Sequence, residues 1–79
     1  MNPSTFRDRV ASLLRSRANQ WIDGRELATV GGAYAWRSRV SDCRQDLGMV
    51  IENRQRRVNG VVISEYRFVP PADDFQLTA

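Results

Sequence analysis

The dipeptide Asn59-Gly60 constrains the fold of this chain more than any other feature of its sequence. Asn-Gly is the preferred pair for a two-residue type I′ turn, which joins two antiparallel strands. If these two residues form the loop, Val58 lies opposite Val61, and the register of every later cross-strand pair follows. The sequence therefore predicts a β-hairpin whose register is set by its turn.

Charge and hydropathy agree with this register on both faces of the hairpin. On one face, Glu52 lies opposite Arg67 and Arg54 lies opposite Glu65, so both pairs carry opposite charges. The other face carries the apolar residues Ile51, Tyr66 and Phe68. A slip of one residue would destroy both patterns. We therefore expect the hairpin to span Val50 to Val69, and Pro70-Pro71 to end its second strand.

The N-terminal part of the chain predicts one amphipathic helix from Thr5 to about Arg17. Its apolar residues, Phe6, Val10, Leu13 and Leu14, recur at helical spacing. Ser4 or Thr5 is expected to cap this helix, and Asn19 to end it.

Two further helices are predicted before the hairpin. Trp21-Ile22 has the character of an extended pair, and Asp23 with Glu26 forms a capping box for a short helix that ends at Gly31-Gly32. The next helix is expected from Ala33 to Leu47, with Gly48 as its C′ glycine. Its inward stripe is Trp36, Val40, Cys43 and Leu47, so Cys43 is interpreted as a core residue rather than a nucleophile. We expect Trp36 in the core, and Trp21 in the core or at its edge.

Composition excludes several classes of function. The 79 residues suffice for one domain, and they include one cysteine and no histidine. An internal disulfide, a Cys/His zinc site and histidine acid–base chemistry are therefore excluded. We expect no enzyme activity, no cofactor and no small-molecule substrate. The sequence shows neither a membrane span nor an export signal, so we expect the protein in the bacterial cytoplasm or nucleoid.

The basic residues give the first indication of a partner. All twelve are arginine, and residues 1–72 carry 12 − 7 = +5 charges. The arginine guanidinium grips phosphates and guanine edges with two parallel hydrogen bonds. The codon usage of a GC-rich genome accounts for most of the missing lysine, but an excess of positive charge still calls for an anionic partner.

The order of these elements resembles the winged helix-turn-helix family. The matching segments are Trp21–Ala28 for the first motif helix, Gly31-Gly32 for its turn, Ala33–Val40 for the second motif helix, and Glu52–Arg54 with Glu65–Phe68 for the wing. The pattern is similar to small single-domain regulators of bacteriophages and mobile elements. The resemblance implies an α+β fold over residues 1–70, with three helices followed by a two-stranded wing. Residues 71–79 are expected to form a flexible tail, on which Phe75 and Leu77 are the side chains able to dock on the domain.

The resemblance also implies a DNA-binding site, because this family places its second motif helix in the major groove. On a helical wheel, the face opposite the core stripe carries Tyr34, Ser38, Ser41 and Gln45, flanked by Arg37 and Arg44. The wing adds Arg54, Arg56 and Arg57. We expect Glu65 to hold Arg54, whereas Arg56 and Arg57 have no acidic partner in this register. Arg25, at the start of the short helix, is the last predicted contact.

The predicted function is sequence-specific binding of double-stranded DNA by a small transcriptional regulator, with a homodimer as an open possibility. The alternative is a winged-helix module that binds another protein, such as a phage-encoded inhibitor, because a fold does not fix a function. RNA binding is less favoured, because the sequence lacks the exposed aromatic residues on which single-stranded bases stack.

Overall fold

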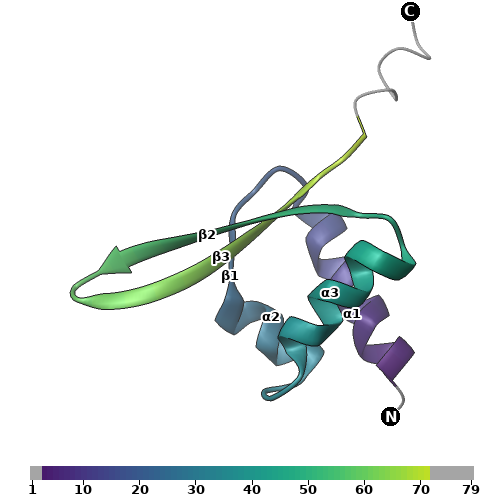
Figure 1. Cartoon of the computed structure of the whole chain (residues 1–79), viewed down its shortest axis with the longest axis horizontal. Coiled ribbons are helices and arrows are strands. Elements are labelled where there is room, and N and C mark those ends of the chain that lie inside the picture. The colour runs from purple at the N-terminus through teal and green to yellow at the C-terminus, as the bar shows by residue number, and fades with distance from the viewer. Residues whose placement is uncertain (1–2, 72–79) are drawn as a thin grey trace, which may run out of the picture.

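The structure is a computed structural model that describes residues 3–71, with side chains from Thr5 onward. It contains three helices, a short strand and a long β-hairpin (Figure 1). In chain order these elements are α1 (Pro3–Ser16), β1 (Ile22–Asp23), α2 (Gly24–Gly31), α3 (Trp36–Asp46), β2 (Val50–Val58) and β3 (Val61–Val69). The fold is α+β with winged-helix topology, as predicted, except that β1 adds a third strand to the sheet. The tail from residue 72 lies outside the described residues.

Helix α1 packs against α3 and supplies one wall of the core. Val10 and Leu14 are fully buried, at the helical spacing that the sequence predicted. The helix begins at Pro3, so the prediction that Ser4 or Thr5 caps it is wrong. Proline suits the first turn of a helix because it lacks an N–H that the turn would leave unbonded. After the helix, Asn19 adopts φ 66°, and its N–H donates to the carbonyl of Phe68 at 2.8 Å.

Helix α2 begins where Asp23 caps it. The Asp23 carboxylate accepts a hydrogen bond from the backbone N–H of Arg25 at 2.8 Å, which confirms the predicted N-cap. Glu26 does not complete the predicted capping box, because its side chain accepts instead from Arg17 at 2.6 Å. The helix ends before Gly32, whose φ of 95° favours glycine.

Helix α3 begins three residues later than the sequence predicted. Ala33–Ala35 form a turn, and the first helical residue is Trp36. The start is set by packing, because the Trp36 ring meets Tyr66 edge to face at a centroid distance of 5.5 Å. Val40 and Cys43 are buried below it, as predicted. The helix ends at Asp46, one residue before the predicted end, with Leu47 as its C-cap, and Gly48 follows as the predicted C′ glycine with φ 64°.

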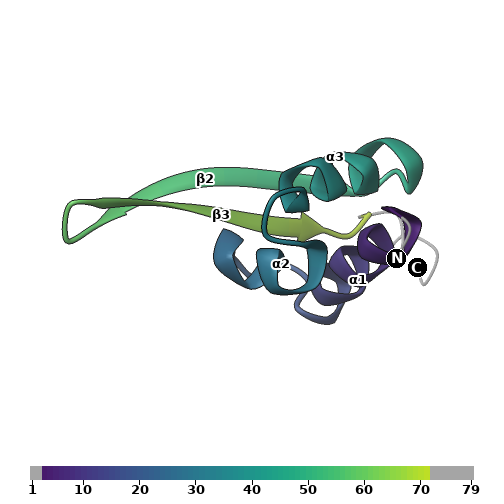
Figure 2. The same cartoon turned by 90° about the horizontal axis from the view of Figure 1, so that it is seen from below.

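The hairpin is as the sequence predicted, residue for residue. Asn59 and Gly60 form the turn with φ of 50° and 80°, and Val58 pairs with Val61. The register continues without a slip to Val50 opposite Val69. The hairpin extends well beyond the helices, as Figures 1 and 2 show from two directions. Its distal half is therefore held by its own strand pairing rather than by the core.

Strand β1 joins the hairpin to the helices. It pairs antiparallel with β3, with Ile22 opposite Tyr66 and Asp23 opposite Glu65, and the strand order is β1-β3-β2. Sequence analysis predicted an extended pair one residue earlier, at Trp21-Ile22, and did not place it in the sheet. Ile22 is fully buried, so β1 fixes the sheet to the core through this side chain.

The two faces of the hairpin differ in kind, because successive residues of a strand point to opposite sides. We call the face that packs on the helices the inner face. It carries Ile51, Tyr66 and Phe68, and further out Gln55, Arg57, Val62 and Ser64. We call the opposite face the outer face. It carries Glu52, Arg54, Arg56, Glu65 and Arg67.

Candidate nucleic-acid interface

Every carboxylate in the described part of the chain is engaged by an arginine. Of the nine acidic residues, Asp73 and Asp74 fall outside residues 3–71, which leaves seven. Their partners are, in chain order, Arg7 for Asp8, Arg25 for Asp23, Arg17 for Glu26, Arg39 for Asp42, Arg7 for Asp46, Arg67 for Glu52, and Arg54 with Arg56 for Glu65. Within residues 3–71, five arginines lack a carboxylate partner: Arg9, Arg15, Arg37, Arg44 and Arg57. The uncompensated charge therefore lies on α1, α3 and the hairpin.

The solvent side of α3 carries most of the residues that the sequence predicted there. Arg37, Ser38 and Gln45 are exposed, and Ser41 is half-buried. Gln45 donates its side-chain N–H to the Ser41 hydroxyl at 3.4 Å, so these two side chains lie together one turn apart. The helix therefore presents a guanidinium, two hydroxyls and an amide on one side.

The two acids of α3 are both neutralised. Asp42 lies 3.0 Å from the Nε of Arg39, and Asp46 lies 3.4 Å from Arg7 of α1. The solvent side of α3 therefore has no unpaired carboxylate that would repel a phosphate.

Arg37 is positioned by an aromatic ring rather than by an acid. Its guanidinium carbon lies 4.7 Å from the centre of the Trp36 ring, and Trp36 itself is buried. Stacking holds the orientation of a guanidinium but leaves the hydrogen-bond donors in its plane free. Arg37 therefore combines a fixed position with donors that have no carboxylate partner among the described residues.

Arg44 and Tyr34 are exposed, but the structure gives them different settings. Arg44 donates two hydrogen bonds to the carbonyl of Ile51, at 2.8 and 3.2 Å, and so ties α3 to β2. Its remaining donors are still available. Tyr34 lies in the turn before α3 and not on the predicted helical face, and its side chain is fully exposed.

Arg25 stands at a position that already holds an anion. Its guanidinium pairs with Asp23 at 2.8 Å, and the same carboxylate caps α2. The hydrogen bonds from Arg25 hold the pKa of Asp23 below its usual value. A phosphate at the start of α2 would have to approach this carboxylate, so Arg25 is the weakest of the predicted contacts.

The three arginines of β2 are not equivalent. Arg54 pairs with Glu65 at 2.8 Å, as predicted. The prediction that Arg56 has no acidic partner is wrong, because its Nε lies 3.3 Å from the same Glu65 carboxylate. Glu65 is the diagonal neighbour of Arg56 rather than its direct partner, and long side chains reach that far across a sheet. Arg57 is exposed, on the inner face, without a carboxylate partner in the described part.

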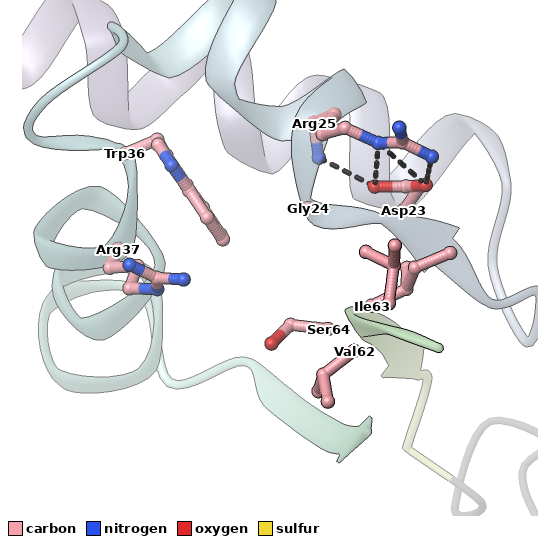
Figure 3. A pocket seen from close by; sticks show the side chains of 9 residues that line it. Asp23, Gly24, Arg25, Trp36, Arg37, Val62, Ile63 and Ser64 are labelled. Carbon is pink, nitrogen blue, oxygen red and sulfur yellow. Dashed lines mark hydrogen bonds and ion pairs between the residues drawn. The ribbon is translucent and has the colours of Figure 1, made fainter. Parts of the chain in front are cut away.

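A groove separates the start of α3 from the hairpin (Figure 3). It has a volume of about 170 Å³, and Trp36 and Arg37 line it from one side while Val62 and Ser64 line it from β3. Gly24 allows this arrangement, since a Cβ there would lie 2.6 Å from the Trp36 ring. The groove is thus bordered by the one arginine of α3 that is both stacked and unpaired.

Sequence analysis missed the setting of Trp21. The ring is half-buried on the outer face, with the guanidinium carbons of Arg54 and Arg67 at 4.1 and 4.7 Å from its centre. Trp21 is therefore not part of the core that packs on the helices, contrary to the expectation, and instead contacts two cations from β2 and β3. Trp21 directly precedes the strand pair Ile22-Asp23, and strand alternation would have placed its ring on the outer face. The sequence analysis did not assign that pair to the sheet, so this signal was not used.

Two further groups of side chains bear on possible metal binding and nucleophilic chemistry. The described residues hold no group of three or more potential metal ligands. Burial raises the pKa of the Cys43 thiol to about 11, so the nucleophilic thiolate is scarce at neutral pH. None of the helices in this part of the chain has the length and apolarity that crossing a bilayer requires.

No family model matches the sequence, and no curated protein or solved structure matches it either.

Proposed function

We propose that this protein binds double-stranded DNA in a sequence-specific manner, as a small transcriptional regulator. The observation that carries the proposal is the distribution of charge after pairing. In the part of the chain that the structure describes, each acid is engaged by arginine, and three of the five unpaired arginines are Arg37, Arg44 and Arg57. These lie on the helix and the hairpin that would meet a duplex in a winged-helix arrangement.

The side chains of α3 support recognition of bases in addition to phosphates. Arginine forms two hydrogen bonds with guanine, and glutamine forms two with adenine. Arg37 and Gln45 are exposed on α3 and supply these two chemistries. Arg57 lies far out on the hairpin, where a phosphate contact is the natural role. We therefore assign base contacts to α3 and backbone contacts to the hairpin.

The test is a fluorescence anisotropy titration of the full chain with two duplexes. One duplex is selected by the protein from a random library, and the other is its scrambled version. We expect Arg37→Ala to lose about 1–3 kcal/mol of discrimination between them. Arg57→Ala should weaken both complexes alike and lower the slope of log K against log salt by about 1. Arg9→Ala removes the same charge from α1 and serves as the control.

The salt dependence of the wild-type protein tests the proposal as a whole. With about four to six phosphates neutralised, log K should fall with log salt at a slope of roughly −4 to −5. A protein that neither binds heparin nor shifts random duplex DNA at low salt would contradict the proposal. That outcome would favour the protein-interaction module that the fold also permits.

A further inference from the structure

Glu65 is the buried charged residue in the described part of the chain. It lies on the outer face of β3 with only 8% of its surface exposed. Two guanidiniums from β2 share its carboxylate, Arg54 at 2.8 Å and Arg56 at 3.3 Å. A buried carboxylate needs one cation to balance its charge, and removing that cation is costly. The cluster of these three side chains therefore holds one cation more than it needs.

Arg54 is the cation that is held from two sides. Its Nε donates to Glu65, and its guanidinium carbon lies 4.1 Å from the centre of the Trp21 ring. Moving Arg54 away would break the shorter ion pair and the stacking on the ring together. Arg54 is therefore anchored on the outer face.

Arg56 is held from one side only. Its contacts with Glu65 are long, at 3.3 Å from Nε and 3.5 Å from Nη2, and its side chain is 56% exposed. The next carboxylate on this face is Asp23, which lies opposite Glu65 on β1 and is already engaged by Arg25. Arg56 does contribute to the lowered pKa of Asp23, so its charge is felt there without a direct pair. No group that faces Arg56 depends on it alone for neutralisation.

We propose that Arg56 is a phosphate contact that becomes available only on binding. It leaves Glu65 when DNA binds, while Arg54 stays and compensates the negative charge of the carboxylate. The inference rests on the proposed function, since it assigns one residue within that DNA interface. The exchange moves the N–H donors of Arg56 from a carboxylate oxygen to a phosphate oxygen. It needs no change in the backbone of the hairpin. Arg54 then acts as a positioning residue that frees Arg56, without touching DNA itself.

The test is a double-mutant cycle on the full chain, read by the salt slope of DNA binding. Arg56→Met should weaken binding to all sequences and lower the slope by about 1. Arg54→Met should do nearly the same, because Arg56 must then remain on Glu65. The double variant should lose no more slope than Arg56→Met alone. Methionine keeps much of the arginine stem, and melting curves confirm that each variant is folded.

Glu65→Gln separates this inference from direct contact by Arg54. We expect Glu65→Gln to tighten binding several-fold, and Arg54→Met to have no effect in that background. If Arg54 itself touched DNA, Arg54→Met would weaken binding in both backgrounds, which would overturn the inference. Arg67→Met controls for loss of stacking on Trp21 and should leave the slope unchanged. If the wild-type protein binds no DNA, the proposed function is wrong. If it binds DNA but the losses of slope in Arg54→Met and Arg56→Met add up in the double variant, only this inference is wrong.

Discussion

The inner and outer faces of the hairpin use the same strands for opposite purposes. On the inner face, Ile51 and Tyr66 are buried against the helices and hold the fold together. On the outer face, arginines and glutamates alternate across the strands and form ion pairs. Arginines are densest on the outer face, yet the fully unpaired Arg57 points to the inner side. The unpaired charge of the hairpin is therefore found where carboxylates are absent, whereas the outer face can offer charge to a ligand only when an arginine leaves its carboxylate.

Removing one aromatic ring from each face should show that the inner face stabilises the fold far more than the outer face. Tyr66→Ala empties a buried site and deletes the contact with Trp36, which should cost about 3–5 kcal/mol in the free energy of unfolding. Trp21→Ala removes a half-buried ring and two cation contacts, which should cost about 1–2 kcal/mol. Urea denaturation measures both, and Tyr66→Phe, which keeps the ring, should lose less than about 1.5 kcal/mol. Equal losses for the two alanine variants would show that both faces carry the fold.

A second change tests how tightly the inner face is packed where α2 meets Trp36. Gly24→Ala places a methyl group 2.6 Å from the ring, with the carbonyl of Ser64 only 3.3 Å away. Overpacking of this kind should cost about 1–3 kcal/mol, seen in urea denaturation. Thr29→Ala, at an exposed position on the same helix, is the control and should change stability by less than about 0.5 kcal/mol. A neutral Gly24→Ala would show that Trp36 can move without loss.

The smallest effect concerns Asp23, which shares the outer-face row with Glu65. Its pKa is lowered in the folded state, so its stabilisation is present above the ordinary value of 3.8 and is lost as the pH falls through the folded value. Asparagine also caps helices, so Asp23→Asn removes mainly the ion pair with Arg25. We expect the melting temperature to fall by less than about 3 °C at neutral pH, and the difference to vanish once the pH is below the folded-state pKa of Asp23. A difference that persists in acid would point to lost packing instead.

The hairpin could be predicted in full because independent constraints agreed on it. Asn59-Gly60 fixed the turn by backbone conformation, and the alternation of charged and apolar residues fixed the register. The start of α3 was missed because nothing local in Ala33–Ala35 prevents a helix. The helix begins where Trp36 has to reach Tyr66, which is a tertiary requirement.

The candidate site was predictable only in its residue types. Sequence placed arginines, serines and glutamine on the correct elements, because the helical and strand periods are regular. It did not reveal that Arg56 reaches Glu65 diagonally, or that Arg44 donates to the carbonyl of Ile51. Both contacts depend on where a long side chain turns after its Cβ, and strand register alone does not specify that. The sequence therefore predicts the face of a helix or strand on which an arginine lies far better than it predicts the group that the arginine binds.

Burial of Cys43 between α1 and α3 has a practical consequence. It is the only cysteine of the chain, its thiol donates to the carbonyl of Arg7 at 3.5 Å, and none of its surface is exposed. A thiol reagent can reach this sulfur only when the two helices separate. The alkylation rate of Cys43 in the native protein therefore measures how readily α1 and α3 separate, without any added label. Comparing this rate with and without duplex DNA would show whether a bound ligand suppresses the separation.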